Sequence, residues 1–299
     1  MRFQSLFTLF ALPAVLAGGN RPGSKVSVIY ETDTVGPWFE NLVVRPSGTI
    51  LATRMDDPGS GTSTPAARPA LTPDVYVFNA GNFSLALGGF VPGSLAVWKV
   101  DLTVNWGHSA PVPERVASLP DALFLNGIAR WDDTRVLVGD IVGNVVYLLD
   151  VTTGDFDVAI DIPETTLVNG IRVHDDTVYF VSGAAGSIYR LPVDADALPT
   201  GPAQLIAADL NLDDFDMADD GTIYAAAVWS NQLLKVTQAG AVTVLAGGPN
   251  SVKLLSCTSA RLGRTRKDRN TVYLSTMGNG AFPSPGDVTT EAKIVAVKV

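Results

Sequence analysis

Four polar residues recur along the chain at nearly one interval, and this spacing constrains the fold more than any other feature. Asn126, Asn169 and Asp213 are 43 and 44 residues apart, Glu40 lies two such intervals before Asn126, and one further step reaches Thr258. Short β-rich runs fill each interval. A repeat of about 40–45 residues with such runs is typical of a β-propeller with four-stranded blades. Six intervals fit into the chain, so the spacing predicts an all-β, six-bladed propeller.

The repeated units have the composition of antiparallel strands. The unit after Asn126 reads GIARWDD, TRVLVGD and VVYLLDVTTG, and the unit after Asn169 reads GIRVHDD, TVYFVSG and SIYRLPVD. Their runs are rich in β-branched and aromatic residues and end at Asp, Asn and Gly turns. The run VSVIYE at 26–31 precedes the first repeat. Because an open ring would expose sheet edges, we expect this run to form the outer strand of the last blade.

The first blade departs from the repeat. Its inner strands, NLVVRP and TILATR, are followed at 56–73 by a segment rich in Pro, Gly, Ser, Thr and Ala, for which we expect an irregular loop. The second strands of the first two units, which begin at Thr49 and Val75, are only 26 residues apart. Roughly seventeen residues are therefore missing from a repeat of this length. Either the blade is truncated or the chain contains a mispredicted splice.

Residues 1–17 have the features of a secretory signal peptide. They carry one positive charge, an apolar core and the small residues Val15 and Ala17 before a cleavage site. This stretch is too short for a membrane anchor. We therefore expect residues 18–299 to form a single secreted domain without a membrane attachment. Asn82, in the sequon Asn82-Phe83-Ser84, is a candidate glycosylation site, with an unmodified turn as the alternative.

The charge pattern argues against a nucleic-acid partner. The formal net charge is −9 and no basic stripe is present. One basic cluster flanks a turn and is interpreted as a solvated loop; it contains Arg261, Arg264, Arg266, Lys267 and Arg269. Cys257 is the only cysteine, so it cannot form an internal disulfide, and its apolar surroundings predict a buried small hydrophobe.

The register of the repeat predicts a site at one mouth of the central channel. If each periodic residue starts an inner strand, the turn after the second strand returns to the same face. The predicted substrate-binding rim around the floor of Glu40, Asn126, Asn169 and Asp213 contains Trp38, Asn79, Asp140, Ser182, Trp229 and Asn279. The result is a cup with an oxygen-rich floor and an aromatic rim.

The floor has two interpretations at this point. Converging carboxylate and carboxamide oxygens suit a hard cation such as Ca²⁺. Alternatively, the Asn-Gly and Asp-Asp pairs are ordinary turn residues that backbone donors satisfy. Neither a G-x-S-x-G elbow nor an H-E-x-x-H motif occurs. The two histidines, His108 and His174, lie in polar turns, which disfavours a Ser-His-Asp hydrolase.

Several phrases resemble a known family. The segments WFENLVVRPSGTILAT, FLNGIA, VNGIRVHDDTVYF and DDFDMADDGTIYAA are similar to the SMP-30/gluconolactonase-like six-bladed propellers. They are closer to a fungal secreted branch that includes hetero-Diels–Alderases of tropolone-sesquiterpenoid biosynthesis. The resemblance implies that Glu40, Asn169 and Asp213 correspond to metal positions and that Asn126 contacts substrate. Glu40 departs from the family pattern because Asn-Leu follows it instead of Gly-Pro.

The resemblance leaves three functions open. The first is a natural-product cyclase that joins a quinone-methide-type heterodiene to a terpenoid alkene by a hetero-Diels–Alder reaction, with Asn126, Asn169 and Asp213 as catalytic hydrogen-bonding groups and no required cofactor. The second is a Ca²⁺-dependent lactonase of the gluconolactonase type. The third is a non-catalytic secreted propeller that binds a ligand. The expected partner is a small terpenoid or polyketide molecule, and we expect the protein to be encoded in a fungal biosynthetic gene cluster.

The leader generates the first testable prediction. We expect signal peptidase to cleave near Ala17, because small residues follow a short apolar core there. N-terminal sequencing of the secreted protein should therefore begin near Gly18. A cytosolic product that retains Met1 would contradict this prediction.

Overall fold

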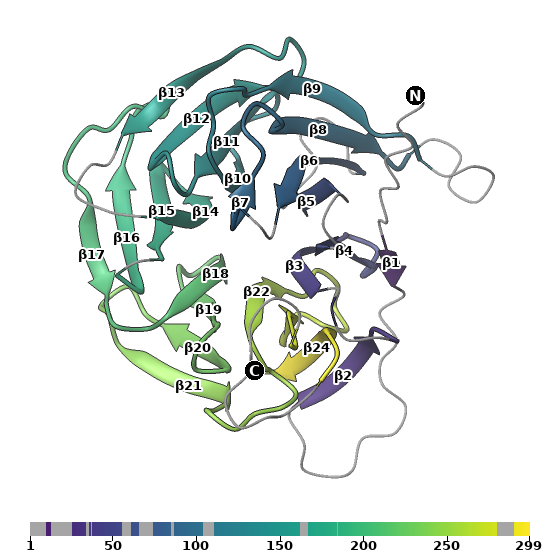
Figure 1. Cartoon of the computed structure of the whole chain (residues 1–299). Helices are drawn as coiled ribbons and strands as arrows, with labels where there is room; N and C mark the ends of the chain where they lie inside the picture. The colour runs from purple at the N-terminus through teal and green to yellow at the C-terminus, as the bar shows by residue number, and fades with distance from the viewer. Residues whose placement is uncertain are drawn as a thin grey trace.

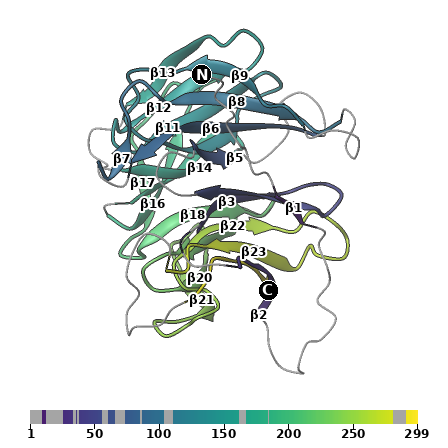
Figure 2. The same ribbon diagram turned by 45° about the vertical axis from the view of Figure 1, so that its right-hand side comes forward.

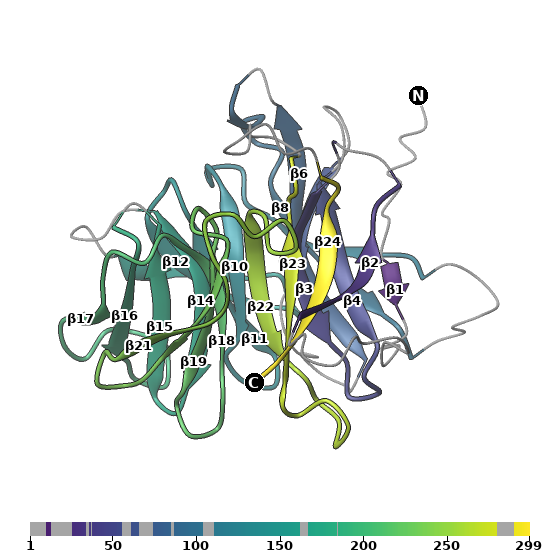
Figure 3. The same cartoon turned by 90° about the horizontal axis from the view of Figure 1, so that it is seen from below.

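The computed structural model describes residues 10–12, 26–33, 36, 38–55, 61–65, 74–84, 87–103, 111–161, 167–183, 185–279 and 290–299. Within these ranges the backbone forms strands and turns, and no helix is long and apolar enough to span a membrane. The antiparallel sheets surround a central axis like the blades of a propeller (Figure 1), and Figure 2 and Figure 3 show the same ring from other sides. The prediction of an all-β propeller with four-stranded blades is confirmed.

Three neighbouring sheets have four strands in chain order from the axis outwards (Figure 1). The first contains β10 (Leu125–Arg130), β11 (Arg135–Asp140), β12 (Val145–Asp150) and β13 (Phe156–Asp161). The second contains β14 (Val168–His174), β15 (Thr177–Ser182), β16 (Ser187–Pro192) and β17 (Gln204–Ala207). The third contains β18 (Leu212–Met217), β19 (Ile223–Ala227), β20 (Gln232–Val236) and β21 (Val242–Gly247).

A fourth sheet closes the ring by joining the two ends of the fold. It contains β22 (Cys257–Leu262), β23 (Thr271–Thr276), β24 (Lys293–Lys298) and, at its outer edge, β2 (Val26–Glu31). β2 pairs antiparallel with β24, and the Lys293 Nζ lies 2.8 Å from Glu31 Oε1 at the end of this ladder. The prediction that residues 26–31 supply the outer strand of the last blade is therefore confirmed.

The remaining two sheets contain the irregular part of the repeat. One has three strands: β3 (Trp38–Val44), β4 (Ile50–Met55) and β1 (Phe10–Leu12), which pairs with β4. The other contains β5 (Gly61–Pro65), β6 (Val75–Ser84), β8 (Ala96–Asp101) and β9 (Glu114–Ser118), with β7 (Gly89–Phe90) paired to the end of β6. Five sheets thus have at least four strands, whereas the β3–β4 sheet has three, and six complete blades are not established.

The structure corrects the expectation of an irregular segment across 56–73. β5 lies inside this segment, pairs with β6 and takes the innermost position of its sheet. Thr62 and Thr64 are β-branched, and Pro65 is tolerated because the inner edge of a blade has no further ladder partner. Residues 56–60 and 66–73 lie outside the described part of the chain. The inner strand that the second blade needed is present, so the shortfall is confined to the outer half of the β3–β4 sheet.

The hydrophobic core consists of clusters that lie between neighbouring sheets around the ring. β4 illustrates how the short sheet remains part of this core. Ile50 and Ala52 pack in the cluster that contains Ile294 of β24, while Leu51 packs on the other face with Tyr76 of β6. Fully burying one such aliphatic side chain contributes about 1.5–3 kcal/mol. The short sheet therefore still connects its two neighbours.

The shortfall in the β3–β4 sheet generates a prediction about the transcript. We expect full-length transcript sequencing to recover an additional segment near codons 56–73. This segment should encode about half of a 40–45-residue blade, because β4 is buried on both faces like the strands of the complete blades. A transcript that matches the present chain through this region would show instead that the sheet is truly truncated.

Candidate functional site

The periodic residues occupy the same irregularity in successive inner strands. In β10, β14 and β18 the antiparallel register shifts on either side of Asn126, Asn169 and Asp213, respectively. Similar shifts occur beside Glu40 in β3 and Thr258 in β22. A bulge of this kind inserts an extra residue and re-aims the neighbouring side chains. The repeated bulge explains how four sheets deliver polar side chains to one level of the axis.

The glycines beside the periodic asparagines are required by close approach of the inner strands. A Cβ on Gly127 would lie 2.2 Å from the backbone oxygen of Asn169. A Cβ on Gly170 would lie 2.2 Å from Asp214 Oδ1. Because these Asn-Gly pairs stand inside strands, their interpretation as turn residues is wrong.

The structure brings the four floor residues together as two amide–carboxylate pairs. The Asn126 Nδ2 donates to Glu40 Oε1 over 3.2 Å, and the Asn169 Nδ2 donates to Asp213 Oδ1 over 2.8 Å. Asn126 is buried, while the other three keep some accessible surface. The floor therefore joins side chains from four sheets that are distant in the sequence.

The floor brings the side-chain carboxylates of Glu40 and Asp213 near each other, and the Asn126 and Asn169 amides that donate to them are neutral. Burial raises the pKa of Asp213 well above its usual value of 3.8, the charges of Glu40 and Asp214 add to this rise, and the hydrogen bond from Asn169 opposes it. Because the folded state then binds the proton more tightly than the unfolded state, stability falls as the pH rises from 3.8 through the folded-state pKa. The carboxylate form of Asp213 therefore destabilises the fold at neutral pH.

The same floor fits a hard cation. Asn169 Oδ1 is buried and has no hydrogen-bond partner among the described residues. A cation held by Glu40, Asn169 and Asp213 would use this oxygen and relieve the repulsion between the carboxylates. In the described part of the chain, no three His, Cys, Asp or Glu side chains gather as a metal cluster, so this set would contain two carboxylates and one amide.

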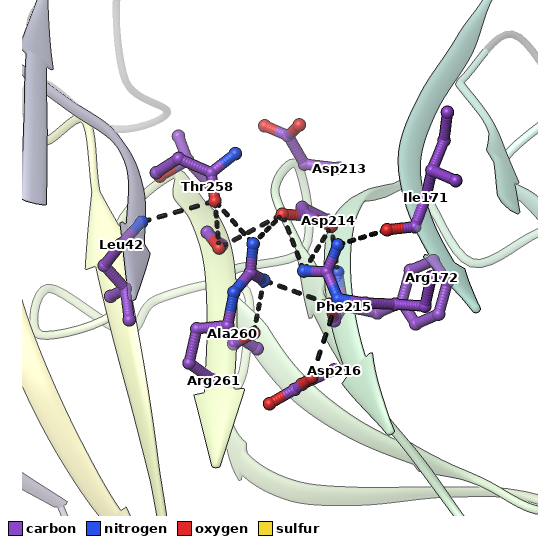
Figure 4. A network of polar contacts seen from close by, with 12 residues as sticks. Leu42, Ile171, Arg172, Asp213, Asp214, Phe215, Asp216, Thr258, Ala260 and Arg261 are labelled. Atoms are coloured by element: carbon purple, nitrogen blue, oxygen red, sulfur yellow. Dashed lines mark hydrogen bonds and ion pairs between the residues drawn. The ribbon is translucent and has the colours of Figure 1, made fainter. Parts of the chain in front are cut away.

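A buried ion-pair network lies directly beneath the floor (Figure 4). Asp214 Oδ2 accepts hydrogen bonds from Arg261 Nη2 at 2.8 Å and from Arg172 Nη2 at 3.2 Å. These three side chains are only 1%, 2% and 7% exposed, respectively. Burial alone would raise the pKa of Asp214, but the two guanidinium groups and the hydrogen bonds outweigh it and lower that pKa. We call Arg172, Asp214 and Arg261 the axial ion cluster.

The sequence held a signal for this cluster that the motif analysis missed. Its two arginines, Arg172 and Arg261, each lie three residues after a periodic position, as does the neighbouring Asp216, so the repeat places them at one deeper level. The assignment of Arg261 to a solvated loop is wrong, because Asp214 compensates its charge inside the channel. The other basic residues of that run remain outside the axial ion cluster.

The predicted rim is only partly exposed. Trp229 is 59% exposed, but Asn79, Asp140 and Ser182 are buried beneath the surface. The carboxylate of Asp140 accepts hydrogen bonds from the backbone amides of the loop at 123–124 and of Gly143. These buried residues shape the loops instead of forming an exposed rim.

The other predicted rim residues have different surroundings. Asn79 Nδ2 donates to the backbone oxygen of Asn126 over 2.8 Å, so it supports a floor residue. Asn279 is partly exposed and its side-chain oxygen accepts from the Thr290 amide. The side chain of Trp38 lies outside the described part of the chain.

Exposed apolar residues that the sequence analysis missed surround the same mouth. Leu123 and Leu167 precede the inner strands β10 and β14, and Val142 follows β11 at the end that pairs with Leu125. Leu167 has a φ of 62°, a left-handed conformation that is unusual for leucine. Together with Trp229, these side chains place apolar surface above a polar floor.

Potential nucleophiles near the floor are inactive in this arrangement. Burial is the largest cause that raises the pKa of Cys257 to about 12, and its thiol lies against the backbone oxygens of Ala227 and Gln232. Thr258 donates its hydroxyl to the Phe39 backbone oxygen. His174 lies at the opposite end of β14 from Asn169, and His108 lies outside the described residues. The buried state predicted for Cys257 is confirmed.

Comparison with known proteins gives relatives of two kinds. No family model matches the chain. It is 26% identical to a candidate hetero-Diels-Alderase of Sarocladium schorii, covering 88% of this chain and 80% of that protein. It is 24% identical to a candidate hetero-Diels-Alderase of a Phoma species, covering 80% of this chain and 83% of that protein.

The solved structures support the fold. The calcium-binding protein regucalcin from Agrobacterium tumefaciens matches with a TM-score of 0.58 at 15% identity, covering 90% of this chain and 92% of that chain. The chain is therefore similar to proteins named as hetero-Diels-Alderases and has the propeller fold of the regucalcin type. This similarity confirms the resemblance seen in the sequence, apart from the six-blade count.

The alignment with the Sarocladium schorii relative is longer than the part of this chain that it matches. It extends over 327 positions, whereas 88% of this 299-residue chain is about 263 residues. That relative therefore contributes roughly sixty aligned residues that have no counterpart here.

The electrostatics of the floor generate a prediction about stability. Without a cation at neutral pH, Asp213→Asn should raise the Tm by about 2–4 °C, the shift that about 1 kcal/mol produces, because it removes an unfavourable buried charge. If the floor binds Ca²⁺, the ion at about 100 times its Kd should stabilise the parent protein by about 2.7 kcal/mol and the variant much less.

Differential scanning calorimetry with EDTA and with Ca²⁺ measures both effects. Asp219→Asn is the matched control, because Asp219 is an exposed aspartate near the opposite mouth. If Ca²⁺ leaves the Tm of the parent protein unchanged, the floor does not bind the cation and is a polar pocket alone.

Proposed function

We propose that this protein catalyses a hetero-Diels–Alder cyclisation in natural-product biosynthesis, joining a quinone-methide-type heterodiene to a terpenoid alkene. The observation that carries the proposal is similarity across most of the chain to two proteins that bear this activity in their names. We further propose that the protein acts after secretion and removal of residues 1–17, with Asn82 as an exposed glycosylation site.

The site geometry supports a cyclase because it combines two surfaces that such a substrate pair needs. The exposed side chains of Leu123, Val142, Leu167 and Trp229 provide apolar contact for a terpenoid. The amides of Asn126 and Asn169 lie below them. Aromatic rings such as that of Trp229 contribute both contact area and a preferred stacking geometry.

The proposed mechanism requires positioning and hydrogen bonding. In the concerted addition, the heterodiene oxygen and its terminal carbon each form one σ bond to the alkene. Three π bonds become one, no group leaves and no proton is transferred. The chain's contribution is to hold both partners in a near-attack pose, for which effective molarities of about 10⁵–10⁸ M are known.

The carboxamides can also make the heterodiene more reactive. Each Nδ2 carries two hydrogens, and one of them is used in the pairs with Glu40 and Asp213. The second N–H of Asn126 or Asn169 would donate to the heterodiene oxygen and draw electron density from the diene. Removing one preorganised donor of this kind lowers the rate by about 10²–10³ in enzymes that depend on it.

A Ca²⁺-dependent lactonase is the second candidate, and a specific observation favours it. The unpartnered Asn169 Oδ1 beside the carboxylates of Glu40 and Asp213 has the donor chemistry of a hard-cation site. A bound Ca²⁺ would supply Lewis-acid polarisation of an ester carbonyl. The residues would position the lactone, and Asp213 would orient the attacking water.

The cyclase proposal predicts a specific defect in a rim variant. Trp229→Ala should lower the stereoselectivity of adduct formation more than it lowers the consumption of a spontaneously reactive substrate, because the uncatalysed addition continues without control of the pose. Chiral chromatography of the adduct measures this effect. Leu205→Ala is the matched control, because Leu205 is exposed on the outer strand β17, away from the mouth.

Gene deletion and lactone hydrolysis separate the two functions. Deletion should leave unjoined precursors or their racemic adducts in the producing organism. Efficient Ca²⁺-dependent hydrolysis of gluconolactone, with unchanged pathway products after deletion, would replace the cyclase by the lactonase.

A further inference from the structure

The structure contains a second cavity at the opposite mouth of the channel. It has a volume of about 420 Å³, within the range of small-molecule sites. It lies where the inner strands β10, β14 and β18 end, and the loop after β22 completes its wall. Trp131 and Met217 give the lining apolar surface, and its charged residues carry both signs. The ionisable residues of the lining are Arg130, Asp132, Arg172, His174, Asp175, Asp216, Asp219 and Arg264.

The axial ion cluster separates this cavity from the floor described above. Figure 4 shows Asp213 on one side of the two guanidinium groups and Asp216 on the other. The terminal nitrogens of Arg172 bind Asp214 and the backbone oxygen of Ile171, so its guanidinium group is held between the floor and the cavity. A ligand in the second cavity would therefore be independent of the proposed cyclisation.

The inner wall of the cavity holds a donor and an acceptor that are incompletely paired. Arg172 Nε is buried and has no hydrogen-bond partner among the described residues. Asp216 Oδ1 lies 3.5 Å from this nitrogen, while Asp216 Oδ2 accepts from the Leu262 amide over 2.9 Å. Asp216 Oδ1 therefore receives no short hydrogen bond from Arg172, whose Nε is itself buried behind the wall.

We propose that this cavity binds a small neutral polyhydroxylated molecule of monosaccharide size. A ligand hydroxyl can donate to Asp216 Oδ1, whose contact with Arg172 Nε is long at 3.5 Å. A ligand carboxylate at this position would face Asp216, and a ligand ammonium would face the guanidinium of Arg172. Each charged ligand therefore meets repulsion from one member of the pair.

The outer wall suits the rest of such a ligand. The indole of Trp131 is fixed by the bond from its Nε1 to the Ala195 backbone oxygen over 3.1 Å. Its ring and the side chain of Met217 provide apolar surface for the C–H face of a sugar ring. Arg264 and His174 add polar groups nearer the solvent, where further hydroxyls would lie.

The test uses three probes of one size that differ in charge: glucose, gluconate and glucosamine. Calorimetry and saturation-transfer NMR on the full chain should detect glucose binding and weaker binding of both charged probes. Asp216→Asn should weaken glucose binding about tenfold, as expected for loss of a hydrogen bond to a charged group. Trp131→Ala should weaken it without altering the buried ion pairs.

Trp229→Ala is the matched control, because this residue lies at the other mouth and its loss should leave glucose affinity unchanged. Folding of each variant is checked by circular dichroism. The proposal is overturned if folded parent protein does not bind glucose, if gluconate or glucosamine binds more tightly, or if Trp131→Ala binds glucose as well as the parent. None of these results bears on the cyclase, whose test is the stereoselectivity of the adduct.

Discussion

The structure depends on the compensation of charge at the channel axis. The inner strands must meet there, and their bulges turn polar side chains inwards. A buried charge without a partner destabilises a protein by about 3–5 kcal/mol. Asp214 of β18 avoids this penalty because guanidinium groups from both neighbouring strands, β14 and β22, converge on it. The axial ion cluster therefore links three sheets as well as satisfying its own charges.

The position of this cluster determines the chemistry on both sides of it. The guanidinium groups are engaged by Asp214 and Asp216, while the amides of Asn126 and Asn169 donate to Glu40 and Asp213 at the floor. This is why the floor retains excess negative charge and suits either a cation or a hydrogen-bonded substrate. On the other side, the Arg172–Asp216 contact is long, so Asp216 Oδ1 can accept from a ligand hydroxyl.

The repeat spacing was sufficient to predict the propeller, the inner strands and the level of the floor, because one physical unit recurs at each interval. The closing strand β2 also followed from the need to cover an edge. β5 was missed because Pro and Gly in its surroundings hide a short Thr-rich strand. Arg261 was missed because its basic neighbours are solvated, and only the third dimension brings Asp214 to it. Burial of Asp140 depends on loop conformation, which the spacing does not encode.

In the β3–β4 sheet, the interpretation of residues 1–17 as a signal peptide conflicts with the pairing of this blade. β4 has buried side chains on both faces, and its outer edge is paired by β1, at residues 10–12. Cleavage near Ala17 would remove β1 and expose that edge, which natural sheets avoid. A secreted form therefore needs another strand beside β4. An internal segment that restored the outer half of this blade would occupy the same edge that β1 covers here. Processing of the leader and completion of the blade are thus linked by one requirement, the pairing of β4.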